Sequence, residues 1–322
     1  MTKTKWHLLS VSISGLFLLA IFWQVNIQQI KEALKTADYA YVPLAVLLTL
    51  LTNILRSYRW KYLLNPIRPI GIVSVFSGVA IGSMANNVLP ARLGELVRSY
   101  FLGQKEDLSK SSTLATIVIE RLFDGFTLLL FLTFISLFFP FPDWIKKVGW
   151  FATAICVAFS VFLAFLVLKK NLTLELVTWS TAWVPAHVAR RVHGLADSFL
   201  TGLAILNHRR DAILAFAFSV LVWTVEAWTY YVVSLCFGFH LPVYVAFVAL
   251  AIVNFGTLIP AGPGYVGTFE FFCVSALSLV SVDKSVALSY ALVLHAVLVI
   301  PITVIGMMYF VKDHVSLAEM RA

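Results

Sequence analysis

The sequence predicts an all-α polytopic membrane protein, and three observations point to this class. The 322-residue chain has a mean hydropathy of +0.90 and only 12% charged residues, whereas soluble domains carry about 25%. Several apolar runs reach the roughly 20 residues that a helix needs to cross the hydrocarbon core of a bilayer. These runs are continuous and do not alternate between apolar and polar residues, which excludes a transmembrane β-barrel.

Six runs have the length of full spans, and two further apolar regions are interrupted. The expected spans are residues 8–26, 40–62, 111–139, 149–169, 211–238 and 287–311. Regions 71–103 and 243–282 are broken near their middle by Pro, Gly and charged residues, so each is either two short spans or one re-entrant helix pair. Both alternatives return the chain to the side from which it entered.

The first run follows a basic N-terminus, "MTKTKWHLLSVSISGLFLLAIFW", which is also typical of a signal peptide. Because the run is long and no A-x-A site follows it, we expect an uncleaved span. Cys156, Cys236 and Cys273 all fall in apolar runs. We expect them to be buried as small hydrophobic side chains, with no disulfide or metal framework.

The distribution of positive charge predicts the orientation. Of the 24 Lys and Arg, three fall in membrane regions: Arg92, Arg98 and Arg121. Five fall in outer segments: Lys31, Lys35, Lys146, Lys147 and Lys284. The others lie on the side of the N-terminus. By the positive-inside rule we expect both termini in the cytoplasm, in the plasma (inner) membrane of a prokaryote. This rule also accounts for the net charge of +8, so no nucleic-acid partner is expected.

The segment 171–210 is predicted to be cytoplasmic and to contain an interfacial amphipathic helix. Arg190 and Arg191 occupy its polar face, and its apolar residues recur at steps of three and four: Val188, Val192, Leu195, Phe199, Leu203 and Leu206. Such a helix lies along the inner leaflet with its arginines near anionic headgroups. A linker helix packed on protein is the alternative.

The order of spans predicts a single transmembrane domain, 1–322, built from two inverted halves, 1–140 and 141–322. The two broken regions contain "NNVLPARLGE" at 86–95 and "NFGTLIPAGPGYVGTFE" at 254–270. Both run from Asn through an aliphatic-Pro-Ala sequence to Gly and Glu. Discontinuous helices at matching positions of inverted repeats point to a transport site near the midplane; a chance coincidence of two Pro/Gly interruptions is the alternative.

Five carboxylates fall in membrane regions: Glu95, Glu120, Asp124, Glu226 and Glu270. Each costs about 2.5–3.5 kcal/mol on insertion unless it is paired or hydrated. Glu120 and Asp124 share a helix face, and Arg121 is placed to pair with Asp124. This group is either a buried ion-pair network or a headgroup or proton site, and the two are compatible.

The first break supplies polar groups suited to an anion. Pro90 and Gly94 interrupt the helix, and the new helix after them offers free N–H groups. Arg92 and Arg98 bring fork-like hydrogen bonding that suits phosphate.

Asn86 and Asn87 are placed to bond backbone groups that the first break frees. At the second break we expect non-helical turns and close backbone approach. The residues that carry this expectation are Pro260, Gly262, Gly264 and Gly267. An ordinary outer loop is the alternative for this stretch.

Two other polar residues receive simpler interpretations. Glu226 is flanked by Trp223 and Trp228, which favours a position near the outer interface. His295 is expected to be a hydrogen-bonding group between helices, and a proton carrier is the alternative. The sequence has no G-x-S-x-G, H-E-x-x-H, P-loop or Asp-rich metal motif, so no catalytic residue, metal site or cofactor is predicted.

At "NNVLPARLGELVRSYFL", "ERLFDGFTLL" and "IPAGPGYVGTFE" the sequence resembles the lysylphosphatidylglycerol synthase transmembrane family, also called the flippase-like domain family, over about residues 10–311. The resemblance implies that the following residues belong to its characteristic motifs: Arg92, Glu95, Arg98, Glu120, Arg121, Asp124 and Glu270. Some members fuse this membrane domain to a soluble synthase, which we expect to be absent here. "PAGPGYVG" departs from the "P-x-P-G-G-x-G" typical of the family.

Resemblance and residues together predict a lipid translocase that binds a phospholipid or polyprenyl- or glycolipid headgroup in a polar pocket between the two broken helices. One alternative is an enzyme, or the membrane subunit of one, that makes aminoacyl- or glycosyl-lipids. Another is a membrane scaffold for a separately encoded lipid synthase.

Overall fold

The computed structural model describes residues 12, 14–21, 23, 25–89, 92–203, 205, 208–239, 241–259 and 262–313. These residues form helices joined by short connections, and no strand occurs among them. The predicted all-α class is therefore confirmed. Of the first expected span, 8–26, only the helical stretch 14–21 and a few flanking residues are described.

The remaining helices follow in chain order. They are α2 (Ile27–Thr36), η1 (Tyr39–Tyr41), α3 (Val42–Leu64), α4 (Ile72–Val88), α5 (Gly94–Lys105), α6 (Lys110–Ser136), α7 (Asp143–Leu168), α8 (Lys170–Ser180), α9 (Ala186–Gly202), α10 (Arg209–Cys236), α11 (Val243–Gly256), η3 (Pro263–Tyr265), α12 (Thr268–Leu277), η4 (Ser278–Val280) and α13 (Lys284–Lys312). Side-chain caps begin several of them: Asn26 accepts from the N–H of Gln28, Ser109 from that of Ser112, and Asp283 from that of Ser285.

Within the described residues, five segments are long and apolar enough to cross a membrane: 39–64, 143–168, 209–236, 263–280 and 284–312. Four of them are the predicted spans now seen as α3, α7, α10 and α13. Helix α6 has 27 residues, about 40 Å at 1.5 Å per residue, and carries the charged residues described below. The chain is a multi-pass membrane protein.

The two interrupted regions form paired short helices. In the first region α4 and α5 have 17 and 12 residues, and in the second α11 and α12 have 14 and 10. These helices are about 15–25 Å long, less than the roughly 30 Å hydrocarbon core. Gly264 and Gly267, with φ of 64° and 92°, interrupt the second region just before α12. The single helices are short, but segment 263–280 as a whole is long and apolar enough to cross a membrane, so the choice between re-entrant pairs and short spans stays a prediction.

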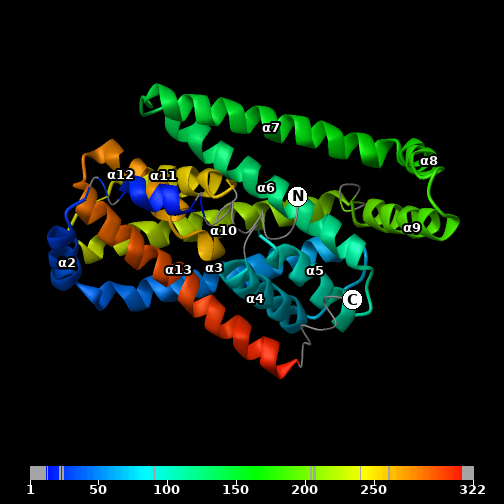
Figure 1. The fold of residues 1–322 in the computed structure, drawn as a ribbon, viewed down its shortest axis with the longest axis horizontal. Coiled ribbons are helices and arrows are strands. Elements are labelled where there is room, and N and C mark those ends of the chain that lie inside the picture. The colour runs from blue at the N-terminus through cyan, green and yellow to red at the C-terminus, as the bar shows by residue number, and fades with distance from the viewer. Residues whose placement is uncertain are drawn as a thin grey trace.

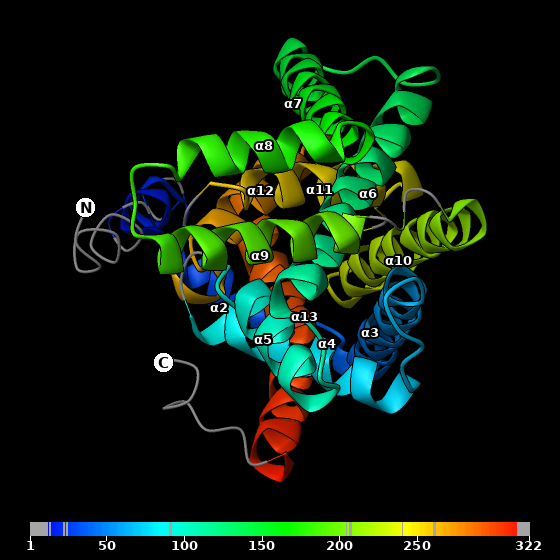
Figure 2. The same ribbon diagram turned by 90° about the vertical axis from the view of Figure 1, so that its right-hand side faces the viewer.

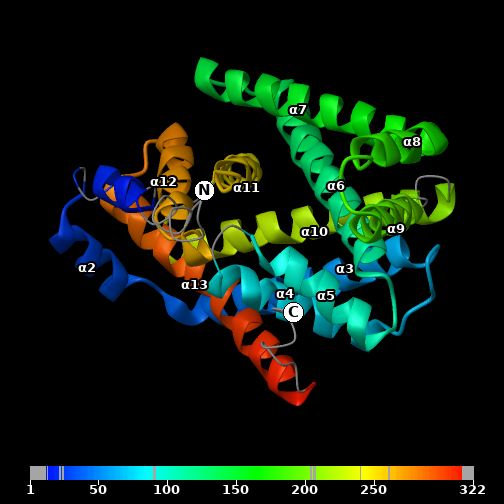
Figure 3. The ribbon, with the colours of Figure 1, turned by 45° about the vertical axis from the view of Figure 1, so that its right-hand side comes forward.

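Helices α3 and α10 pack against each other through the middle of the molecule, and α13 crosses them beside α4 (Figure 1). Helix α2 lies at one end of the structure, and α8 and α9 lie side by side at the opposite end (Figures 1 and 2). Helix α7 packs on α6 and α8 and lies at the periphery (Figure 3). Its exposed aromatic residues, among them Trp150 and Phe151, are suited to contact with lipid.

Packing partners occur in corresponding pairs along the two predicted halves. Helix α3 packs on α4 as α10 packs on α11, α4 on α5 as α11 on α12, and α5 on α6 as α12 on α13. Likewise α13 covers α4, and α6 packs on α11. An inverted repeat would produce this correspondence, and the division into halves stays a prediction.

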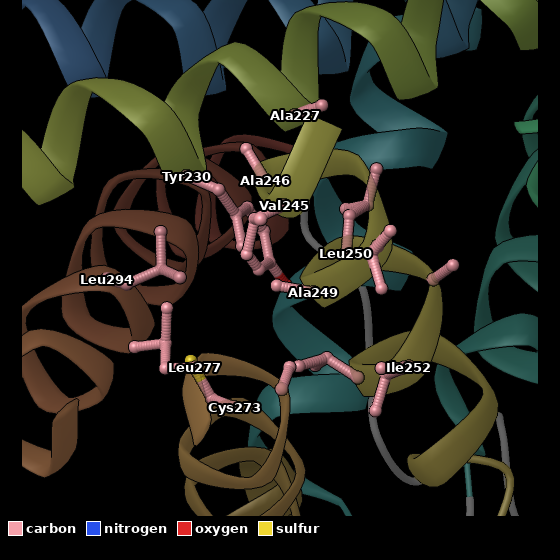
Figure 4. Packing of buried hydrophobic residues seen from close by; sticks show 14 of the residues in the cluster. Ala227, Tyr230, Val245, Ala246, Ala249, Leu250, Ile252, Cys273, Leu277 and Leu294 are labelled. Carbon is pink, nitrogen blue, oxygen red and sulfur yellow. The ribbon is translucent and has the colours of Figure 1, made fainter. Parts of the chain in front are cut away.

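The largest apolar cluster holds the second break in place. Small residues of α11, including Ala246 and Ala249, pack against Tyr230, Cys273 and other side chains of α10, α12 and α13 (Figure 4). Small side chains let helix backbones approach closely in a membrane. Cys273 is buried in this cluster and Cys236 is buried outside it, whereas the expected burial of Cys156 is wrong because its side chain is only partly covered; all three are free cysteines.

Helix α9 has features of both predicted arrangements, the interfacial helix and the linker helix packed on protein. Its C-terminal part packs on α6, where the hydroxyls of Ser111 and Ser112 donate to the carbonyls of Leu195 and Ser198. Nearer its N-terminus, Val188 and Val192 are exposed, as an interfacial helix requires. Leu206 lies outside the described residues.

Candidate functional site

The two helix breaks meet inside the bundle. Arg92, at the first break, directs its guanidinium to the second: Nη2 lies 3.2 Å from Thr257 Oγ1 and 3.4 Å from the Thr257 carbonyl. The guanidinium carbon also lies 5.6 Å from the centre of the Tyr265 ring. Helix α4 also packs on η3, and Arg92 and Thr257, which are 165 residues apart in sequence, are in direct contact.

Close backbone contact shapes the first break. A Cβ at Gly94 would collide with the carbonyl oxygen of Gly82, and it would lie 2.6 Å from the backbone nitrogen of Asn86. The Asn86 side chain accepts from the N–H of Gly94 at 2.8 Å and thereby caps α5. Asn87 Nδ2 donates to Thr303 Oγ1 of α13 at 2.8 Å. Pro90 lies outside the described residues.

Glycine and a carboxylate shape the second break. Gly262 donates its N–H to Ser14 Oγ at 2.8 Å, and the positive φ of Gly264 and Gly267 suits residues without a side chain. Glu270 Oε2 accepts from the N–H of Gly267 at 2.7 Å and closes the start of α12. Pro260 lies outside the described residues.

A polar cavity of about 180 Å³ lies between the breaks. Its walls come from α3, α4, α6, α10, α11 and α13 together with both breaks. Five of the residues singled out from sequence line it: Asn86, Asn87, Arg92, Glu95 and Arg121. At about 30 Å³ per molecule, this volume corresponds to roughly six waters, so charged groups inside it have room for hydration or a small polar ligand.

Charged residues of α6 form a cluster behind the cavity with one arginine each from α3 and α5. This cluster, here called the α6 ion cluster, consists of Arg59, Arg98, Glu120, Arg121 and Asp124. Glu120 accepts from both terminal nitrogens of Arg98, at 2.9 and 3.0 Å. Arg59 lies 2.9 Å from Glu120 and 2.5 Å from Asp124.

Arg121 joins this cluster to the cavity. It lies 2.6 Å from Glu120, 3.1 Å from Asp124 and 3.8 Å from Glu95. With Glu95 included, three arginines therefore face three carboxylates, and the charges of the network balance. The network holds α3, α5 and α6 together.

The terminal nitrogens of Arg98 are both used within this cluster. Besides its bidentate pair with Glu120, its guanidinium carbon lies 3.6 Å from the centre of the Trp60 ring. The structure does not bring Arg98, Glu120 or Asp124 to the cavity wall. They support Arg121, which does line it.

Two functional residues went unrecognised in the sequence. Arg59 and Arg56 were assigned to the inner side, yet Arg59 is completely buried in the ion cluster and Arg56 lines the cavity. Their spacing of three residues, within the expected span 40–62, was the available signal because it places both on one helix face.

Glu226 lies in the cavity wall instead of at the outer interface. It is 8% exposed and pairs with Arg56 Nη2 at 2.5 Å. Arg56 on α3 therefore gives Glu226 an oppositely charged partner inside the bundle. The tryptophans that flank Glu226 in the sequence give no indication of this partner. His295 does bridge helices: Nδ1 lies 2.6 Å from Glu270 Oε1.

The sequence of this chain matches a known protein family. Residues 7–306 match the family described as the lysylphosphatidylglycerol synthase TM region. The chain belongs to this family.

Relatives of this member of the lysylphosphatidylglycerol synthase TM region family include two archaeal UPF0104 membrane proteins. One, from Methanocaldococcus jannaschii, is 22% identical over 91% of both chains. The other, from Methanothermobacter thermautotrophicus, is 26% identical over 80% of this chain and 81% of its own. The glycosyltransferase AglD of Haloferax volcanii is 23% identical over 90% of this chain but 51% of its own length. No solved structure matches this family member.

Proposed function

We propose that the protein is a lipid translocase, which takes an anionic lipid headgroup into the cavity between the two breaks and passes it between leaflets. Membership of the lysylphosphatidylglycerol synthase TM region family supports a lipid-related role in a membrane. The observation that carries the finer proposal is Arg92. It lines the cavity where the breaks meet, and within the described residues it forms no ion pair.

An unpaired arginine in an apolar bundle is costly, and an anionic ligand would remove that cost. The Nε of Arg92 is buried and has no hydrogen-bond partner among the described residues. A phosphate oxygen would accept from this guanidinium in the fork-like geometry that arginine offers. Headgroup amines or hydroxyls would reach Glu95 and Glu226 on other walls of the cavity.

The contact between the breaks also offers a route for movement. Each re-entrant pair enters from one side and contributes its tip to the cavity, so separation of the tips on alternate sides would expose the headgroup to one leaflet at a time. The lipid tails would remain in the bilayer throughout. We propose a prokaryotic plasma membrane with both termini in the cytoplasm, because the excess of Lys and Arg lies on that side.

The test is reconstitution in vesicles that contain a headgroup-intact phosphatidylglycerol labelled on its acyl chain. A reductant outside the vesicles then reports the transfer of label from the inner to the outer leaflet. We expect Arg92→Gln to slow transfer about tenfold or more, since a charge-assisted hydrogen bond contributes about 1.5–3 kcal/mol. Arg210→Gln, at an exposed position in the first turn of α10, is the matched control. Equal rates for wild type and Arg92→Gln would contradict the proposal.

A lipid-modifying membrane subunit is the second candidate. It is favoured by the alignment of this chain with half of AglD, a protein whose name describes a glycosyltransferase. A separately encoded synthase would then supply the reaction. This candidate predicts that a deletion strain lacks one lipid species, whereas translocation predicts the same species with a changed distribution between leaflets.

A further inference from the structure

His295 and Glu270 form a titratable pair in which His295 lines the cavity and Glu270 does not. His295 lies within α13, and its side chain is 12% exposed and faces the cavity. Its Nδ1 lies 2.6 Å from Glu270 Oε1, while the other oxygen of Glu270 caps α12 through Gly267. The imidazole also stacks on Phe269, with 4.3 Å between ring centres. The pair therefore connects the second break to the long helix behind it.

The first half of the chain contains a corresponding pair. Glu95 lies in the first turn of α5, directly after the first break, and faces Arg121 of the following long helix with Nε and Oε1 3.8 Å apart. Glu270 likewise lies in the first turn of α12 and faces His295 on α13. Arginine is permanently charged, whereas imidazole gains and loses its proton between about pH 5 and 8. Of the two pairs, only the second contains a residue type that ionises near neutral pH.

The charge on His295 affects the net charge of the cavity, because the other charged groups that line it nearly cancel. Three arginines and two glutamates line it besides His295, a formal excess of one positive charge. The other titratable or charged groups on the elements around His295 are Arg56, Arg92, Glu95, Arg121, Glu226, Tyr230, Tyr265, Cys273 and Tyr290. With His295 protonated, its pair with Glu270 is neutral. With His295 deprotonated, the pair is negative and cancels the excess.

We infer that His295 and Glu270 form a proton-binding site whose occupancy is coupled to anion binding in the cavity. The inference rests on the proposed function, because the coupled anion is the lipid headgroup. A proton on His295 restores the positive excess that attracts the anion. By linkage, a bound anion raises the affinity of the site for a proton to the same degree. Headgroup binding would therefore take up a proton.

The experiment measures binding of dioctanoyl phosphatidylglycerol to the purified full chain by calorimetry. Its phosphodiester keeps the same charge throughout the range studied, so pH changes act on the protein. We expect wild-type affinity to be about fivefold or more higher near pH 5.5 than near pH 7.5. Titrations in two buffers of different ionisation enthalpy count the protons taken up on binding, which we expect to be detectable near neutral pH.

Two variants separate charge from packing. His295→Arg mimics the permanent charge of Arg121, so its affinity should stay near the acid-side wild-type value at both pH values. His295→Gln should stay near the value measured at pH 7.5 and take up no proton. Wild-type binding that is equal at both pH values, or proton uptake that persists in His295→Gln, overturns this inference alone. Absence of binding to wild type at every pH overturns the proposed function and this inference with it.

Discussion

Arg59 offers the sharpest test of the α6 ion cluster. Its side chain is completely buried, with Nη1 2.5 Å from Asp124 and Nη2 2.9 Å from Glu120, and Nη1 also donates to Ser219 at 3.1 Å. Arg59→Met keeps much of the side-chain volume but leaves three carboxylates facing two arginines. Removal of one partner from a buried ion pair costs about 3–5 kcal/mol, so we expect a loss of stability of that size.

Arg59→Lys should lose less, about 1.5–3 kcal/mol, because it keeps the charge but gives up one of two charge-assisted contacts. The free energy of unfolding is measured in mixed micelles by detergent titration with tryptophan fluorescence. Lys170→Met is the control, since Lys170 pairs with Asp197 at 2.7 Å with both side chains about half exposed and such pairs contribute about 0–1 kcal/mol. A cost for Arg59→Met no greater than that of the control would refute the reasoning.

Three further predictions concern the breaks and the core. Gly94→Ala should prevent the contact between α4 and α5 and lower the yield of folded protein in size-exclusion chromatography. Gly194→Ala on α9 is the control, because a Cβ there meets no atom within 4 Å, and it should leave the yield unchanged. Asn86→Ala removes the acceptor for the Gly94 N–H and should cost about 1 kcal/mol in the same unfolding assay; no change would argue against the cap. Cys273 is fully buried and Cys156 only partly, so a membrane-permeable maleimide should label Cys156 first, and the reverse order would contradict the packing.

The sequence reveals the breaks because their signals are local. Gly, Pro and charge interrupt apolar runs at 86–95 and 254–270, and no uninterrupted helix accommodates them. Likewise Arg121 and Asp124 lie three residues apart on α6, so their pairing follows from helix geometry alone. These residues were identified without knowledge of the tertiary contacts.

The partners of those residues depend on packing, which no local pattern contains. Arg59 and Glu120 lie on different helices and meet only because α3 packs on α6. The same holds for Arg56 and Glu226, and for Arg92 and Thr257. The residue type of Arg98 suggests phosphate binding, whereas packing directs both of its terminal nitrogens to Glu120 and places its guanidinium over Trp60.

Photo-crosslinking tests the central claim most directly. A phospholipid with a photoreactive group on its headgroup is incorporated with the protein into vesicles, and the crosslinked peptides are mapped by mass spectrometry. If the headgroup occupies the cavity between the breaks, label should appear in both 86–95 and 254–265, and Arg92→Gln should reduce it at both. Label confined to the outward faces of helices such as α7, unaffected by that substitution, would contradict the account.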